Sequence, residues 1–121
     1  MMDYSKMSDF EINRLVAIAE GHKCYYGDGS YTNDGINVTV KGNRRIGWFN
    51  PCREGDTAWQ IIRDNEINIL WNWNEEGLHG ATALPLYEYE HENVLRAAMT
   101  VFLMMQESKI VPANSTWSDL R

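Results

Sequence analysis

The sequence is poor in the residues that build metal centres and disulfide frameworks. It contains two cysteines, Cys24 and Cys52, which lie far apart, and it has no Cys-x-x-Cys or cysteine/histidine zinc spacing. Nothing in the sequence indicates an oxidising compartment, so we expect both thiols to be reduced and at least partly buried. We therefore predict no metal and no other cofactor.

Positive charge and long apolar runs are also scarce. Eleven Lys and Arg residues face 17 Asp and Glu residues, which gives a net charge of −6. This balance disfavours duplex nucleic acid as a partner, because such binding depends on basic contacts to phosphate. The longest apolar stretch, 94–105, is interrupted by Arg96 and Thr100 and is too short to cross a bilayer. With no signal-peptide pattern at the N-terminus, we expect no membrane association.

Catalytic motifs are missing as well. The sequence has no Gly-x-Ser-x-Gly elbow and no Walker pattern, and its three histidines stand in no context typical of catalysis. The segment Glu88–Glu92 is the one candidate metal cluster, because a strand would place its three glutamates on one face. A solvated strand edge explains the same pattern and is favoured, because the sequence has no EF-hand spacing and no supporting Asp/Asn cluster.

What the sequence does contain predicts a small globular domain. Its 121 residues are 44% hydrophobic and include five tryptophans, so we expect a single domain over residues 1–121. Ser8, with Glu11 three residues later, forms a capping-box pattern that predicts a helix to about residue 20. Gly21 is well placed to end that helix. Apolar residues at helical spacing predict its buried stripe: Ile12, Leu15, Val16 and Ala19.

Alternating and apolar patterns predict the remaining elements. Strands are expected at residues 23–26, 36–41, 45–49 and 67–73, with a further extended segment at 81–90 that Pro85 interrupts. Helices are expected at 57–65 and at 94–109, the latter capped by Asn93, and residues 110–121 as an extended tail. The order α-β-β-β-α-β-β-α predicts an α+β fold, in which an antiparallel or mixed sheet of four to five strands packs against about three helices. In this prediction Trp71 and Trp73 share a face with Ile67 and Ile69 and contribute to the core.

Three places on the predicted surface are candidates for binding a ligand or partner. The hairpin around Arg44 and Arg45, with Trp48 beside it, could contact phosphate or an acidic group. Trp117 lies in a polar tail and must either fold back onto the domain or dock on a partner. Asp9 and Asn13 are predicted to face away from the core on the first helix, where a partner surface and simple solvation explain them equally well.

Several segments resemble one known family. Residues 2–13, Asn50-Pro51-Cys52 with Trp59-Gln60-Ile61-Ile62, and residues 93–106 are similar to the NinX-like proteins of lambdoid and P22-like bacteriophages. The resemblance spans nearly the whole chain, and its first and last segments are the most specific. It implies a phage accessory protein in the cytoplasm of an infected bacterium, and it supplies no activity, cofactor or catalytic residue.

We weigh three functions. The favoured one is stoichiometric binding to a host or phage protein, without enzymatic activity. The alternative is a module that captures a nucleotide or another small molecule, and a small metal-dependent hydrolase is the least favoured. The apolar stretch 94–105 also leaves room for a homodimer, because one small domain need not cover such a helix on all sides.

Overall fold

The protein is built from three α-helices and six strands in the part of the chain that the structure describes. That part of the computed structural model comprises the backbone of residues 2–21, 23–24, 38–41 and 46–114, and the side chains within 2–21 and 49–109. All of its strand pairs are antiparallel, so the fold class is α+β, as predicted. In chain order the elements are η1 (Tyr4–Lys6), α1 (Asp9–Ala19), β1 (Lys23–Cys24), β2 (Val38–Lys41), β3 (Ile46–Phe49), α2 (Gly55–Asp64), β4 (Asn68–Glu75), β5 (Leu78–Ala83), β6 (Tyr87–His91) and α3 (Val94–Asn114).

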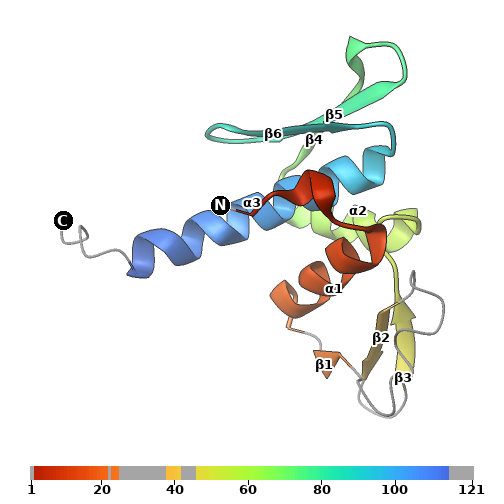
Figure 1. The fold of residues 1–121 in the computed structure, drawn as a ribbon, viewed down its shortest axis with the longest axis vertical. Helices are drawn as coiled ribbons and strands as arrows, with labels where there is room; N and C mark the ends of the chain where they lie inside the picture. The colour runs from red at the N-terminus through yellow and green to blue at the C-terminus, as the bar shows by residue number, and fades with distance from the viewer. Residues whose placement is uncertain (1, 22, 25–37, 42–45, 115–121) are drawn as a thin grey trace.

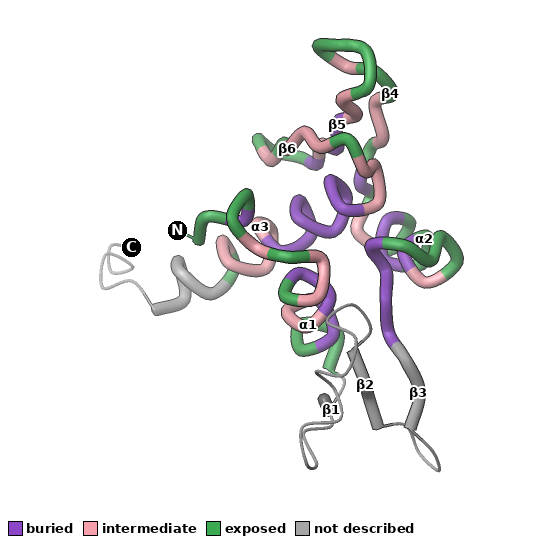
Figure 2. The backbone as a smooth tube through the Cα atoms, turned by 45° about the vertical axis from the view of Figure 1, so that its right-hand side comes forward, coloured by how far each residue is buried: buried purple, intermediate pink, exposed green. Residues whose placement is uncertain are grey.

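Helix α3 runs through the middle of the molecule. Figure 1 shows the β4–β6 sheet on one side of it and α1, with the smaller sheet, on the other. Helix α2 packs against it as well. Every residue from Arg96 to Leu103 is buried, as the purple stretch in Figure 2 shows. The apolar character of this stretch is therefore explained by packing within one chain.

The local signals for the first helix predict its structure closely. The Ser8 hydroxyl accepts a hydrogen bond from the Glu11 backbone N–H, and the Glu11 carboxylate accepts one from the Ser8 backbone N–H, so the capping box is confirmed. Gly21 has a φ of +88°, the left-handed conformation that glycine adopts most readily after a helix. The buried face is rotated from the predicted one, and it consists of Ile12, Asn13, Val16 and Ala17.

The strands form two separate sheets. β1, β2 and β3 make one sheet, and β4, β5 and β6 make the other. The prediction of one sheet with four to five strands is wrong, since neither sheet in the described part of the chain exceeds three. The boundaries differ too: Glu76 and Gly77 form a tight turn, and β5 begins at Leu78, before the extended segment expected at 81–90. Strand pairing depends on contacts between distant segments, which alternation within one segment does not encode.

A bulge in β4 separates the two tryptophans that were predicted to lie in the core. The register with β5 shifts between Leu70 and Glu75, and Asn72 has a φ of +48°, which asparagine tolerates better than most residues. Ile69 packs against the core, whereas Trp71 is 65% exposed. The core assignment of Trp71 is therefore wrong, because Trp71 lies beyond the part of β4 that packs against the core.

Trp73 lies on the opposite face of the sheet from Ile69. A Cβ atom placed on Gly80 would collide with the Trp73 ring, so the indole covers the one position of β5 that has no side chain. Gly80 is buried as a result, and Trp73 is partly exposed. Trp73 thus packs on the sheet without reaching α3, and its assignment to the core between sheet and helices is also wrong.

The last helix is longer than predicted. α3 continues to Asn114, so the expectation of an extended chain from residue 110 is wrong for residues 110–114. A proline within a helix removes one backbone hydrogen bond and disfavours the helical turn before it, but it does not end a helix outright. Residues 115–121 lie outside the described part of the chain.

Candidate functional site

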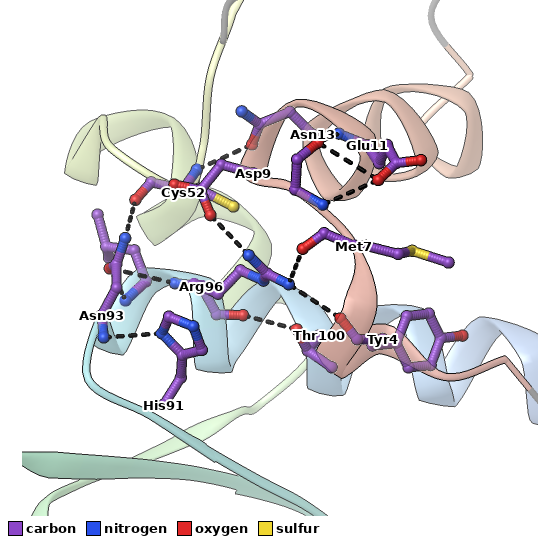
Figure 3. Close-up of polar contacts among 12 residues, drawn as sticks. Tyr4, Met7, Asp9, Glu11, Asn13, Cys52, His91, Asn93, Arg96 and Thr100 are labelled. Carbon is purple, nitrogen blue, oxygen red and sulfur yellow. Dashed lines mark hydrogen bonds and ion pairs between the residues drawn. The ribbon is translucent and has the colours of Figure 1, made fainter. Parts of the chain in front are cut away.

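Three segments that are distant in sequence meet beside the first turns of α3. They are the N-terminal segment with the start of α1, the turn at Asn50–Cys52, and the N-terminal end of α3. Figure 3 shows a continuous set of polar contacts that joins them. These are the same segments that carry the family resemblance, so the resemblance reflects one spatial cluster.

Arg96 is the hub of this cluster. Its guanidinium donates from Nη1 to Oδ1 of Asp9 at 2.8 Å, and from Nη2 to the backbone carbonyls of Tyr4 at 2.9 Å and Met7 at 2.7 Å. The Arg96 side chain is 5% exposed and the Asp9 side chain 26%. Arg96 Nε is the one buried side-chain nitrogen or oxygen in the described part of the chain without a hydrogen-bond partner. Arginine can bridge three acceptors because its planar fork carries five donors.

A second set of amides links α1 to the Asn50–Cys52 turn and to α3. Asn13 Nδ2 donates to Oδ1 of Asn50 at 2.6 Å, and its Oδ1 accepts from the Cys52 backbone N–H at 3.0 Å. Asn93 Nδ2 donates to the Cys52 carbonyl at 2.9 Å. The Asn93 Oδ1 accepts from the backbone N–H of Leu95 at 3.0 Å, which confirms the predicted cap of α3. These amides hold the turn between the two helices.

Cys52 lies within this network but is poorly suited to nucleophilic chemistry. It is a free cysteine with 1% of its surface exposed. Burial raises the pKa of its thiol to about 12, with a further contribution from the Asp9 carboxylate. A nucleophilic cysteine needs the opposite, a lowered pKa and access to solvent. Burial of this thiol agrees with the prediction, and the Cys24 side chain lies outside the described residues.

The N-terminal segment is also fastened further along α3. The Tyr4 hydroxyl donates to Oε1 of Glu107 at 2.7 Å, and the Met2 backbone N–H donates to Oε2 at 3.2 Å. Burial and the adjacent Glu107 carboxylate raise the pKa of the Tyr4 phenol well above its usual value. The phenol therefore stays protonated and remains a donor. Together with Arg96, this contact clamps residues 2–9 across the surface of α3.

His91 joins the last strand to this network. Its Nδ1 accepts from the Asn93 backbone N–H at 2.9 Å, so the bond requires an unprotonated Nδ1. Burial lowers the pKa of His91 below its ordinary 6.5, and the Arg96 cation lowers it further, against smaller opposing effects of Asp9 and Glu92. Protonation of His91 therefore costs more free energy in the folded state than in the unfolded state, and it lowers the stability of the fold.

We predict that this histidine makes the protein less stable under mildly acidic conditions. Because the folded pKa lies below the unfolded one, its contribution is complete above about pH 6.5 and declines as the pH falls toward the folded value. Urea unfolding at several values between about pH 7.5 and 5.5 measures this decline. His91→Gln should show a shallower decline over the same range. Equal slopes for the two proteins would contradict the prediction.

The β4–β6 sheet presents a second feature, a face that no helix in the described part of the chain covers. Ala81, Ala83, Ile69, Tyr87 and Tyr89 contact the core on the α3 side. Because side chains alternate along a strand, their neighbours point the other way. We call this opposite side the outer face, and it is formed by Asn68, Leu70, Trp73, Thr82, Glu88 and Glu90.

The outer face is polar in character and is hollowed at one end. Asn68 Nδ2 donates to the Thr82 hydroxyl at 3.3 Å, and Asn74 Nδ2 donates to Oε2 of Glu90 at 2.8 Å. A hollow of about 310 Å³ opens where the face meets the β5–β6 loop. Its lining comprises Asn68, Thr82, Ala83, Leu84, Pro85, Leu86, Tyr87 and Glu88. Leu84 and Leu86 are 84% and 91% exposed.

Comparison with protein families identifies the chain. The family profile described as "Bacteriophage P22, NinX" matches residues 3–106. The protein belongs to the NinX family of phage proteins. Comparison with curated proteins and with solved structures finds no match. The family membership confirms the resemblance seen in the sequence and supports the description of a phage accessory protein.

Two of the predicted site residues of this NinX-family protein lie elsewhere than expected. Asn13 is fully buried, so its prediction as a surface residue facing a partner is wrong. Asp9 is mostly covered and paired with Arg96. The orientation of Asn13 was predicted wrongly because the Asn50–Cys52 turn covers this side of α1, a contact that helical periodicity does not reveal. A partner-binding role for Asp9 stays a prediction.

The other predicted site residues are not placed by the structure. Arg44, Arg45 and Trp117 lie outside the described residues, and for Trp48 only the backbone, in β3, is described. These sites stay predictions. In the Glu88–Glu92 segment Glu90 accepts a hydrogen bond from Asn74, and no group of three His, Cys, Asp or Glu residues in the described part of the chain could hold a metal ion.

Arg96 is the residue that sequence reasoning missed in the NinX-family protein. A lone arginine within an apolar helical stretch was the available signal, because a buried charge requires partners.

No described helix is both long enough and apolar enough to cross a membrane.

Proposed function

We propose that this NinX-family protein acts by stoichiometric binding to another protein of the phage or its host. The observation that carries the proposal is the exposure of large apolar side chains on the β4–β6 sheet and its loop. Trp71, Leu84 and Leu86 are among the six large apolar residues most exposed in the described part of the chain. Leu84 and Leu86 line one hollow together, whereas Trp71 is exposed on β4. Exposed neighbouring leucines are typical of binding surfaces, and tryptophan is enriched among residues that dominate interface energies.

The polar network beside α3 supports binding over catalysis. Its ionisable groups are engaged in contacts within the chain: Arg96 with Asp9 and two carbonyls, and Tyr4 with Glu107. The Cys52 thiol is buried with a raised pKa. These groups have the properties of a structural network, whereas a catalytic site presents polarised groups to a cleft. The hollow beside the β5–β6 loop contains Glu88, and a second hollow, lined by Asn65, Glu66, Asn68, Leu84 and Met105, contains Glu66. A carboxylate in each of these hollows disfavours an anionic nucleotide as the ligand.

An affinity purification from cells infected by a P22-like phage tests the proposal. We expect the tagged full-length chain to retain one protein at near-equal stoichiometry, and Trp71→Ala to reduce that retention more than about tenfold. Trp59→Ala is the matched control, because Trp59 is 56% exposed but lies on α2. Absence of any near-stoichiometric partner from infected cells would overturn the proposal.

A further inference from the structure

The negative charge of the protein is concentrated on the β4–β6 sheet. Residues 66–93, which contain this sheet and its flanking loops, hold six of the 17 Asp and Glu residues and none of the 11 Lys and Arg residues. This segment therefore carries a charge of −6, and the rest of the chain is neutral. The whole net charge of −6 thus belongs to one structural unit.

Two of these carboxylates stand on the outer face, which none of the described helices covers. Glu88 and Glu90 project from β6 beside Thr82 and Gly80 of the neighbouring strand. The three helices lie on the other side of the sheet, as Figure 1 shows. A like-charged partner, including a second copy of this chain, would bring glutamates against glutamates at this face.

The hollow at the end of the outer face combines apolar walls with one carboxylate. Leu84 and Leu86 form an exposed apolar rim, and Glu88 lies in the same lining. Lysine and arginine side chains have this double character, since an aliphatic stem carries the charged group. The hollow volume of about 310 Å³ is ample for one such side chain. The hydrogen-bonded pair Asn68 and Thr82 lies in the same lining and offers further polar contacts.

We infer that the outer face docks a lysine- or arginine-rich segment of the protein partner. One basic side chain enters the hollow with its stem along Leu84 and Leu86 and its charge at Glu88. A second basic residue pairs with Glu90, beside the Trp73 ring, which offers a surface for cations. The inference rests on the proposed function, and it adds the chemical class of the partner and the face that binds it.

A titration of the full-length ¹⁵N-labelled protein with a short synthetic peptide of alternating lysine and serine tests this inference. We expect saturable amide shifts at Thr82, Glu88 and Glu90 that weaken as the salt concentration rises. The double variant Glu88→Gln/Glu90→Gln should weaken binding about tenfold, as expected from two partly exposed ion pairs. Glutamine keeps an acceptor for Asn74, so the fold is preserved, and urea unfolding verifies this.

Matched controls distinguish binding at the outer face from non-specific attraction of a basic peptide to an acidic protein. Glu20→Gln/Glu54→Gln removes the same charge from exposed positions at the ends of α1 and α2, and it should change affinity less than about twofold. A peptide with glutamate in place of lysine should produce no shifts. Equal weakening by both double variants, shifts centred elsewhere, or no shifts would overturn the inference.

The same variants distinguish this inference from the proposed function. A partner that is captured from infected cells and retained at full stoichiometry by Glu88→Gln/Glu90→Gln would overturn the inference and leave the proposed function standing. Binding of the lysine peptide at the outer face without any captured partner would overturn the proposed function alone.

Discussion

Arg96→Met should lower the free energy of unfolding by about 3 kcal/mol or more. The substitution keeps the apolar stem of the side chain but removes its three hydrogen bonds to Asp9, Tyr4 and Met7. Breaking a buried ion pair by removing one partner costs about 3–5 kcal/mol, and the lower end applies because the Asp9 side chain is 26% exposed. This is a large share of the stability of a typical domain.

Urea unfolding of Arg96→Met measures this loss, and a surface arginine provides the control. Arg63 pairs with Asp64 at 3.0 Å, but both side chains are more than half exposed. Arg63→Met should therefore change stability by less than about 0.5 kcal/mol. The double variant Asp9→Asn/Arg96→Met should be more stable than Arg96→Met, because it removes the carboxylate that has lost its partner. A loss below about 1 kcal/mol for Arg96→Met would contradict the role of Arg96 as the hub.

Hydrogen exchange gives a local readout of the same substitution. Residues 2–9 are fastened to α3 by Arg96 and by the contacts of Glu107 with Tyr4 and Met2. Arg96→Met removes the hydrogen bonds from Arg96 and leaves the Glu107 contacts and the packing of Tyr4 and Met7, so amides in η1 and the first turn of α1 should exchange faster than those of the β4–β6 sheet. Uniform acceleration across the chain would indicate a global loss of stability without release of this segment.

The features predicted correctly from sequence depend on neighbours along the chain. The capping box at Ser8 and Glu11, the helix stop at Gly21 and the cap at Asn93 each involve groups within a few residues. The hairpin of β2 and β3 likewise follows from alternation and a turn between them. Such signals are complete in the sequence, because all the interacting groups are adjacent.

The features that were missed depend on contacts between distant residues. Asn13 bonds to a residue 37 positions away, and Arg96 to one 87 positions away. A periodic pattern ranks positions by hydrophobicity, so it placed a buried asparagine on the surface. The bulge at Asn72 had the same effect in a strand, where one irregular residue moved Trp73 to the outer face.

The candidate surfaces likewise combine features that the sequence reveals with features that only the fold reveals. The outer face requires knowledge of which strands pair and which side α3 covers, and neither is readable from a single segment. The acidic segment 88–92 was visible in the sequence, but its relation to the exposed Leu84 and Leu86 was not. Residue identity was therefore sufficient to find the charge, and the fold was needed to place it beside an apolar rim.

Asn13→Leu should be the second strongly destabilising substitution, with a loss of about 2–4 kcal/mol. Leucine has the same number of side-chain heavy atoms and the same branching as asparagine, so the shape at this fully buried position is largely kept. The loss instead comes from polar groups that lose their partner, the Cys52 backbone N–H at 3.0 Å and the Asn50 Oδ1 at 2.6 Å. Asn74→Leu at an exposed position should change stability by less than about 0.5 kcal/mol in the same urea experiment.

Asn13→Asp separates hydrogen bonding from packing at this position. Aspartate keeps an acceptor for the Cys52 N–H but, when ionised, sets a negative charge against the Asn50 Oδ1 in a buried site. Burial raises the folded pKa of such a carboxyl above its unfolded value of about 3.9, so the folded state binds the proton more tightly. The deficit relative to the native protein should therefore shrink as the pH falls toward about 4. The deficit of Asn13→Leu should stay nearly constant over the same range, because leucine does not titrate. Aspartate and asparagine have nearly the same volume, so a deficit of Asn13→Asp that is independent of pH would contradict the titration of a buried carboxylate and would assign the loss to the missing Nδ2 donor.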